Sequence, residues 1–117
     1  MSMILDVDVF LKACEQKPCQ ENVHLYRGLI AEEYEEFRQA SVMRDDVEQL
    51  DACMDMIWVI LGYCHMKGFD VRGAWKEVAD SNLNKIDRKT GKVIRRPEDG
   101  KILKPEGWKP PNLKPYV

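Results

Sequence analysis

The sequence predicts an all-α fold, a four-helix bundle followed by an extended or short-hairpin tail. Two observations lead to this prediction. Four stretches repeat apolar residues at helical spacing, and the composition changes to prolines and glycines near residue 88. The chain has 117 residues, of which 44% are hydrophobic and 32% charged, which suits one domain that can bury a core. We therefore expect a single domain over residues 1–117, with a helical core at about 4–88 and a basic tail at about 89–117.

The four expected helices follow one another with clear breaks. The first covers about residues 7–16 and ends before Pro18, which cannot continue a helix. The second covers about 23–43, and the third about 46–66, with Gly68 as its C-terminal stop. The fourth begins after Asp70 as N-cap and continues to about residue 86.

The last 31 residues have a different character. Residues 87–117 hold five of the six prolines, and the segment "GKVIRRPEDGKILK" predicts a short hairpin with its turn at Glu98–Gly100. A disordered tail is the alternative, but the spaced isoleucine, leucine, tryptophan and tyrosine residues favour an ordered one.

The formal net charge of −2 conceals an asymmetry. Residues 81–117 carry ten lysines and arginines against four acids, whereas the first 80 residues carry eight basic and sixteen acidic side chains. An acidic body with a basic tail suits a cation bound by the body and an anion contacted by the tail. A solvated tail that folds back onto an acidic surface explains the charges equally well.

Several classes of protein are disfavoured. No run of 18 apolar residues suggests a membrane span, and the acidic start "MSMILDVDVF" does not resemble a signal peptide. The four cysteines form no C-x-x-C pair, so a zinc site is not expected, and reduced thiols fit a cytoplasmic protein. Nothing in the chain resembles a nucleic-acid-binding motif.

The stretch "AEEYEEF" in the second expected helix places carboxylates in the apolar stripe. With Glu32 at zero on a helical wheel, Glu36 lies at about 40° and Glu33 at about 100°, among the apolar residues, while Glu35 lies near 300° outside them. Burial of ionised carboxylates costs several kcal/mol each unless something compensates for it.

The third expected helix repeats the pattern. Its segment "ACMDMIWVILGYC" is apolar almost all round, which predicts a buried helix, and Asp55 is the one acid within it. On the same wheel Asp51, Asp55 and Glu48 form one stripe. The nearest arginines, Arg27 and Arg38, cannot neutralise all these acids, so a bound divalent cation is expected, Mg²⁺ by default. Surface acids on wrongly phased helices are the alternative.

The fourth expected helix places Asn82 and Lys85 within the stripe of Val71, Trp75 and Val78. An inward amide and ammonium could contact a nucleotide's base, sugar or phosphates. Equally, Asn82 could cap a neighbouring helix end while Lys85 pairs with an acid.

Together these motifs resemble a known group of enzymes. The order "EExxE" (Glu32, Glu33, Glu36), paired acids before "MIWVILG", then "SNLNK" and "DGKILKPEGWKPP" is similar to the all-α nucleoside triphosphate pyrophosphohydrolases, the MazG-like and phosphoribosyl-ATP pyrophosphohydrolase-like proteins. The resemblance covers about residues 9–111. It implies a helical bundle assembled as a homodimer or homotetramer, and hydrolysis of a nucleotide between its α and β phosphates.

The resemblance also implies site residues. Glu32, Glu33 and Glu36 match the first acidic motif, and Asp55 matches the aspartate of the second, usually E-x-x-D, although Ala52 stands where the glutamate is expected. We expect metal ligands among the acids of both motifs and phosphate contacts from the fourth helix and tail. The expected ligands of Mg²⁺, or of Mn²⁺ in its place, are Glu32, Glu33, Glu36, Asp51, Asp55 and Glu48. The expected substrate contacts are Asn82, Lys85, Arg95, Arg96, Lys101 and Lys104.

The expected mechanism and its rivals follow. Glu32 or Glu33 would accept a proton from the attacking water as general base. The rivals are a phosphoribosyl-ATP pyrophosphohydrolase of histidine synthesis and a non-catalytic helical module whose acids pair with a partner's basic residues.

Overall fold

The structure is a computed structural model that describes residues 2–117. The chain forms two compact units, Met1–Val71 and Arg72–Val117, which are described separately. Residues 2–117 form four α-helices, one two-stranded hairpin and one short 3-10 helix, so the all-α prediction is confirmed. The single domain over residues 1–117 stays a prediction. A helix long and apolar enough to span a membrane is absent from residues 2–117.

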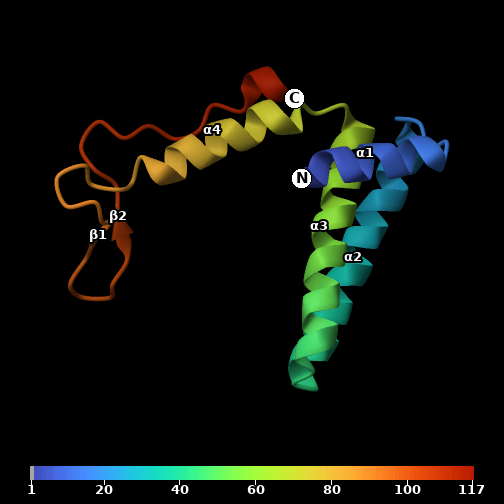
Figure 1. Cartoon of the computed structure of the whole chain (residues 1–117), viewed down its shortest axis with the longest axis horizontal. Helices are drawn as coiled ribbons and strands as arrows, with labels where there is room; N and C mark the ends of the chain where they lie inside the picture. The colour runs from blue at the N-terminus through green and yellow to red at the C-terminus, as the bar shows by residue number, and fades with distance from the viewer. Residues whose placement is uncertain (1) are drawn as a thin grey trace. The chain divides into compact units, whose positions relative to one another are not determined.

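The first unit contains helices α1 (Met3–Ala13), α2 (Gln20–Val42) and α3 (Asp46–Lys67). Figure 1 shows α2 and α3 side by side as an antiparallel hairpin, with α1 lying across the end at which α3 finishes. A core of buried side chains joins the three helices. Its members are Val7, Leu11, Val23, Tyr26, Val59 and Met66.

Local signals set the ends of these helices. The Ser2 hydroxyl accepts a hydrogen bond from the Leu5 N–H, so α1 begins four residues before the predicted start. The Asp45 carboxylate caps α3 in the same way, through the Glu48 N–H. Gly68 ends α3 in the left-handed conformation with φ 74°, as predicted.

The prediction that α3 is buried on all sides is wrong for the single chain. Ala52, Val59, Gly62 and Met66 are buried, but one flank is open to solvent. Exposed apolar side chains on α3 include Leu50, Met54, Ile57, Trp58 and Ile60. The cause is that α1 and α2 together cover only part of the helix surface.

The second unit contains α4 (Val71–Leu83), strands β1 (Ile94–Arg95) and β2 (Ile102–Leu103), and a short 3-10 helix η1 (Lys114–Tyr116). The strands pair antiparallel, with Ile94 opposite Leu103. Gly100 has φ 73° in the connecting turn, so the predicted hairpin is confirmed. After β2 the chain runs back along α4 (Figure 1).

Candidate active site

Three carboxylates converge between α2 and α3. Glu33, Glu36 and Asp55 each offer an oxygen atom, and these atoms lie within 4.8 Å of one another. Glu33 and Glu36 are three residues apart on α2 and so share one helix face. Asp55 comes from the adjoining face of α3, whose close antiparallel packing on α2 brings the third carboxylate into the group.

The environment disfavours negative charge at this cluster. Burial, the neighbouring Glu36 carboxylate, and the charges of Asp55 and Asp51 raise the pKa of Glu33 to about 7. Burial, followed by the charges of Asp51 and Glu36, also raises the pKa of Asp55. Both shifts arise first from burial and then from the like charges of the neighbouring carboxylates.

No counter-charge from residues 2–117 relieves this repulsion, since none of the three carboxylates takes part in an ion pair there. Arg38, the nearest predicted partner, pairs instead with Glu35 at 3.0 Å, outside the cluster. The Oε2 atom of Glu33 is buried and has no hydrogen-bond partner. An orphaned carboxylate oxygen beside two further carboxylates is a donor set that fits a divalent cation.

The other predicted ligands lie outside this group of three. Glu32 and Glu48 are exposed, and neither shares the 4.8 Å grouping. Asp51 is also exposed, but its charge contributes to the raised pKa of both Glu33 and Asp55. Metal binding by these three acids stays a prediction.

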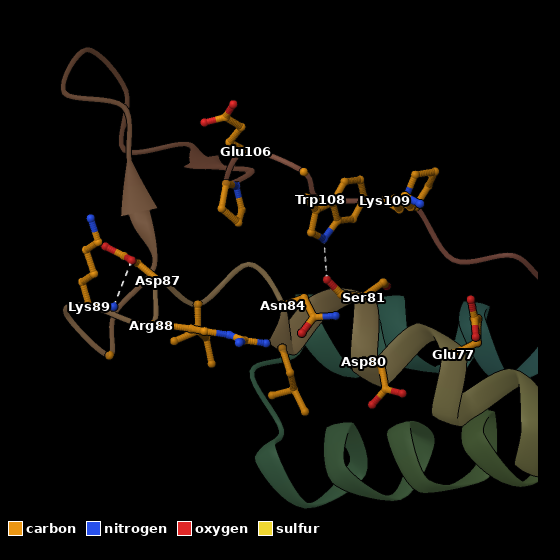
Figure 2. A pocket seen from close by; sticks show the side chains of 16 residues that line it. Glu77, Asp80, Ser81, Asn84, Asp87, Arg88, Lys89, Glu106, Trp108 and Lys109 are labelled. Atoms are coloured by element: carbon orange, nitrogen blue, oxygen red, sulfur yellow. Dashed lines mark hydrogen bonds between the residues drawn. The ribbon is translucent and has the colours of Figure 1, made fainter.

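The expectation that Asn82 faces inward is wrong, because its side chain is exposed. Its amide donates to the Val78 carbonyl at 3.2 Å and its oxygen accepts from Lys85 Nζ at 3.1 Å. Trp75, on the predicted apolar stripe, is 69% exposed. The tail covers a different face of α4, where Trp108 donates its indole N–H to the Ser81 carbonyl (Figure 2).

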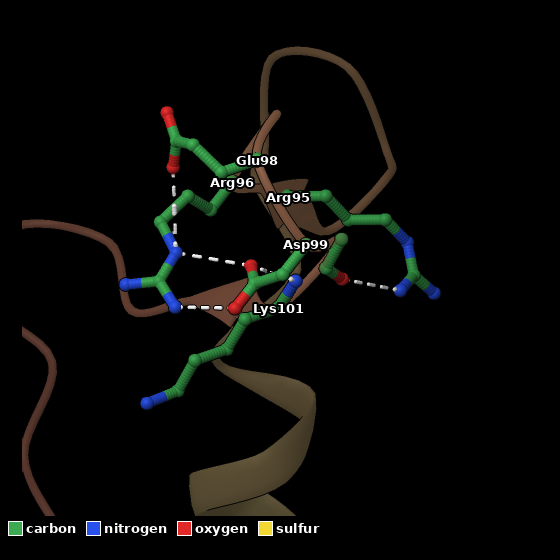
Figure 3. Close-up of polar contacts among 6 residues, drawn as sticks. Arg95, Arg96, Glu98, Asp99 and Lys101 are labelled. Atoms are coloured by element: carbon green, nitrogen blue, oxygen red, sulfur yellow. Dashed lines mark hydrogen bonds and ion pairs between the residues drawn. The ribbon is translucent and has the colours of Figure 1, made fainter.

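The tail arginines are engaged within the hairpin (Figure 3). Arg95 donates to the Gly100 carbonyl at 2.9 Å, and Arg96 donates from Nε to Asp99 at 3.0 Å. These bonds give both arginines a structural role, and phosphate contact by Arg95, Arg96 and Lys101 stays a prediction. Lys104 lies with Nζ 4.5 Å from the centre of the Trp108 ring.

The sequence predicts an ordered tail but does not predict the hydrogen bond from Trp108 to the Ser81 carbonyl. The two residues are 27 positions apart, and neither belongs to a motif that names the other. The signal that could have pointed to the contact is one tryptophan in a proline- and lysine-rich tail, where a buried indole needs an acceptor for its N–H.

Comparison with known proteins shows which family the chain belongs to. No curated protein matches the chain. A sequence model described as phosphoribosyl-ATP pyrophosphohydrolase matches residues 12–82, well over half of the chain. The match contains α2, α3 and all three converging carboxylates, and it ends before the tail. The chain therefore belongs to the phosphoribosyl-ATP pyrophosphohydrolase family, a family of nucleotide pyrophosphohydrolases.

Proposed function

We propose that the chain is a Mg²⁺-dependent pyrophosphohydrolase that cleaves a nucleoside triphosphate between its α and β phosphates, releasing a monophosphate and pyrophosphate. One observation carries the proposal: Glu33, Glu36 and Asp55 converge without a counter-charge, and a buried oxygen of Glu33 lacks a partner. Membership in a pyrophosphohydrolase family supports the reaction class.

Each candidate residue has a proposed role in the reaction. Glu33, Glu36 and Asp55 would hold Mg²⁺, or Mn²⁺ in its place, with Asp51, Glu32 and Glu48 as further candidates. When bound, the cation supplies charge neutralisation for the phosphate oxygens. Glu32 or Glu33 would accept the proton of the attacking water at a carboxylate oxygen. By the family resemblance, Ala52 stands where the second motif usually has a glutamate, and we propose Asp51, one residue earlier, in its place.

Phosphoribosyl-ATP is the second candidate substrate, because the matching family is described by that activity. Both substrates present a phosphoanhydride between α and β phosphates, so the carboxylate cluster serves either one. The third reading, a non-catalytic partner-binding module, is disfavoured by the match to a hydrolase family.

The exposed apolar flank of α3 supports assembly into a homodimer or homotetramer. Location in the cytoplasm belongs to the same proposal, because the four cysteines are free thiols.

The deciding experiment measures pyrophosphate released from each nucleoside triphosphate and from phosphoribosyl-ATP, with Mg²⁺ and with a chelator. Glu36→Gln and Asp55→Asn should each lower release by on the order of a hundredfold or more, as should removal of Mg²⁺. The matched control is Glu35→Gln, one residue before Glu36 but outside the cluster, which should release pyrophosphate at the wild-type rate. Undiminished release by Asp55→Asn would refute the site.

A further inference from the structure

Helices α2 and α3 come close together where the Tyr26 ring lies against Gly62. A Cβ atom added at Gly62 would stand 2.7 Å from Cδ1 and 3.2 Å from Cζ of that ring. Non-bonded carbon atoms pack at about 3.5–4.0 Å, so a side chain does not fit there at the present separation of the two helices. Gly62 does not have a positive φ, so the position requires the space that a glycine leaves and not its backbone freedom.

The Tyr26 ring is not free to make room. It is 4% exposed, and its hydroxyl donates to Gln16 Oε1 at 2.6 Å. The Gln16 N–H in turn donates to the Leu11 carbonyl at 3.1 Å, so the acceptor is fixed to the end of α1. A group added at Gly62 would therefore push α3 away from α2, because close-packed interiors pass strain on to the backbone.

The carboxylate cluster lies two helical turns from this contact on both helices. Tyr26 precedes Glu33 by seven residues on α2, and Gly62 follows Asp55 by seven residues on α3. Seven residues turn a helix by about 700°, so the members of each pair share a face to within about 20°. The two helices run antiparallel (Figure 1), so both offsets point the same way along the hairpin. The contact at Gly62 and the cluster therefore belong to one interface, about 10 Å apart along it.

A second close contact lies on the other side of the cluster. Ala40, seven residues after Glu33 on α2, is buried, and its carbonyl accepts from Gln49 Nε2 at 3.3 Å. Gln49 precedes Asp55 by six residues on α3. The two helices are thus fixed to each other on both sides of the carboxylates, so the separation at these contacts sets the separation at the cluster.

We propose that Gly62 is a positioning residue for the cation of the carboxylate cluster. Its missing side chain lets α3 lie against the Tyr26 ring, and this approach brings Asp55 to the two glutamates of α2. Oxygen ligands of Mg²⁺ tolerate little variation in distance, since the ion requires near-octahedral geometry at about 2.0–2.1 Å. A wider interface would withdraw the carboxylate that α3 contributes to the group of three. The inference rests on the proposed function, because the cation is the one that this function requires.

The test is a Mn²⁺ titration of the full chain without nucleotide, in which electron paramagnetic resonance measures the free ion. Gly62→Ala should weaken Mn²⁺ binding by about tenfold or more, as expected when a residue that orients the ligands is changed. Gly28→Ala adds the same methyl group to α2, where nothing lies within 4 Å, and should bind Mn²⁺ like the wild type. Asp55→Asn should lose the binding, which identifies the site. Wild-type affinity of Gly62→Ala would overturn the proposal.

A loss of stability alone has to be separated from a displaced ligand. Val7→Ala removes buried side-chain atoms from α1 in the same core. It should therefore lower the midpoint of urea denaturation and leave the Mn²⁺ affinity unchanged. Affinity lost equally in Val7→Ala and Gly62→Ala would mean that Mn²⁺ binding follows overall stability, and the positioning role would be wrong.

A second substitution at the contact tests whether the Tyr26 ring is the cause. Tyr26→Leu removes Cε1 and Cζ of the ring and so makes room for the methyl group of Gly62→Ala. The double variant should regain most of the Mn²⁺ affinity, although it loses more stability than Gly62→Ala alone because a buried aromatic ring is gone. A double variant that binds Mn²⁺ no better than Gly62→Ala would contradict the proposal.

If circular dichroism shows that Gly62→Ala does not fold, Ala40→Val decides the question. This substitution adds bulk at the second contact, so it should widen the interface from the other side and weaken Mn²⁺ binding in the same sense. Wild-type affinity of Ala40→Val would mean that the helix separation does not control the cluster, and the proposal would fail.

Failure of this inference differs from failure of the proposed function. A chain that releases pyrophosphate with Mg²⁺, and whose Gly62→Ala variant binds Mn²⁺ like the wild type, refutes the positioning role alone. A chain whose Mn²⁺ affinity falls in Gly62→Ala, but which releases no pyrophosphate from any nucleotide, refutes the function alone. Absence of Mn²⁺ binding by the wild type would overturn the inference together with the metal site.

Discussion

Each of the two units is stabilised internally by a different kind of interaction. Every buried apolar side chain of the described residues belongs to the first unit, from Val7 on α1 to Met66 on α3. In residues 72–117 the one buried residue is Ser81, and the segment is held by hydrogen bonds such as Trp108 to Ser81. The first unit is an apolar core and the second a segment fastened to a helix.

The two units also differ in net charge. Residues 1–71 carry fourteen acids and six basic side chains, and residues 72–117 carry six acids and twelve basic ones. In the first unit the core fixes Glu33 and Asp55 close together, so they cannot move apart to relieve their repulsion. In the second, Arg96 turns onto Asp99 and Arg95 onto a carbonyl. A rigid core can therefore maintain an unfavourable charge arrangement, whereas an exposed hairpin satisfies its own charges.

The largest effect on stability should come from the core of the first unit. A methyl group added at Gly62 would meet the ring of Tyr26, whose Cδ1 lies 2.7 Å from the new atom. Tyr26 is 4% exposed and its hydroxyl donates to Gln16 at 2.6 Å, so the ring cannot easily move. Gly62→Ala should therefore lower the free energy of unfolding by about 2 kcal/mol, measured by urea denaturation.

Gly28→Ala is the matched control on α2. Nothing lies within 4 Å of the methyl group that it would add, so this variant should be more stable than the wild type by about 0.5–1 kcal/mol. Equal effects of the two substitutions would contradict the close approach of α3 to the Tyr26 ring.

The next effect concerns the crowded carboxylates. The pKa of Glu33 is about 7 in the folded chain against an ordinary 4.5, so the folded state binds its proton more tightly. The stability contributed by that proton is full below pH 4.5 and is lost as pH rises through 7. In chelator, the melting temperature of the wild type should fall between about pH 5 and pH 8.

Glu33→Gln should make the melting temperature depend less on pH between about pH 5 and pH 8, because the titrating group is gone. Glu35→Gln should retain the pH dependence, since hydrogen bonds from Gln39 and Arg38 lower the pKa of Glu35 from its ordinary value, which already lies below pH 5. A slope that persists in Glu33→Gln would place the pH dependence elsewhere.

The smallest effect should come from the hairpin of the second unit. Asp99→Asn weakens the contact with Arg96 in an exposed turn, and exposed ion pairs contribute little to stability. The melting temperature should change by at most about one degree, and circular dichroism should be unaltered. A fall comparable to that of Gly62→Ala would mean that the hairpin supports the fold as strongly as the core does, and the contrast between the units would fail.

The candidate site was predictable where it depends on one helix at a time. Helical phase placed Glu33 and Glu36 on the face of α2 toward the apolar residues, and isolation in an apolar run singled out Asp55. Phase did not show that the Glu36 side chain is exposed, nor that Glu32 lies outside the group, because these depend on how far α2 and α3 overlap. The inward position of Asn82 was wrongly predicted because the tail covers a neighbouring face of α4.

The sequence by itself determined the four α-helices, their breaks at Pro18 and Gly68, the hairpin turn, and the helix faces on which the candidate acids lie, since periodicity, capping and turn chemistry act over a few residues. Only the tertiary structure decided which acids meet and which face of α4 the tail covers. Those outcomes depend on contacts between distant segments, α2 with α3 and Trp108 with Ser81, whose geometry no local pattern specifies. The packing of α2 on α3 brings Glu33, Glu36 and Asp55 into one carboxylate cluster. In the tail, Arg95 and Arg96 form hydrogen bonds within their own hairpin.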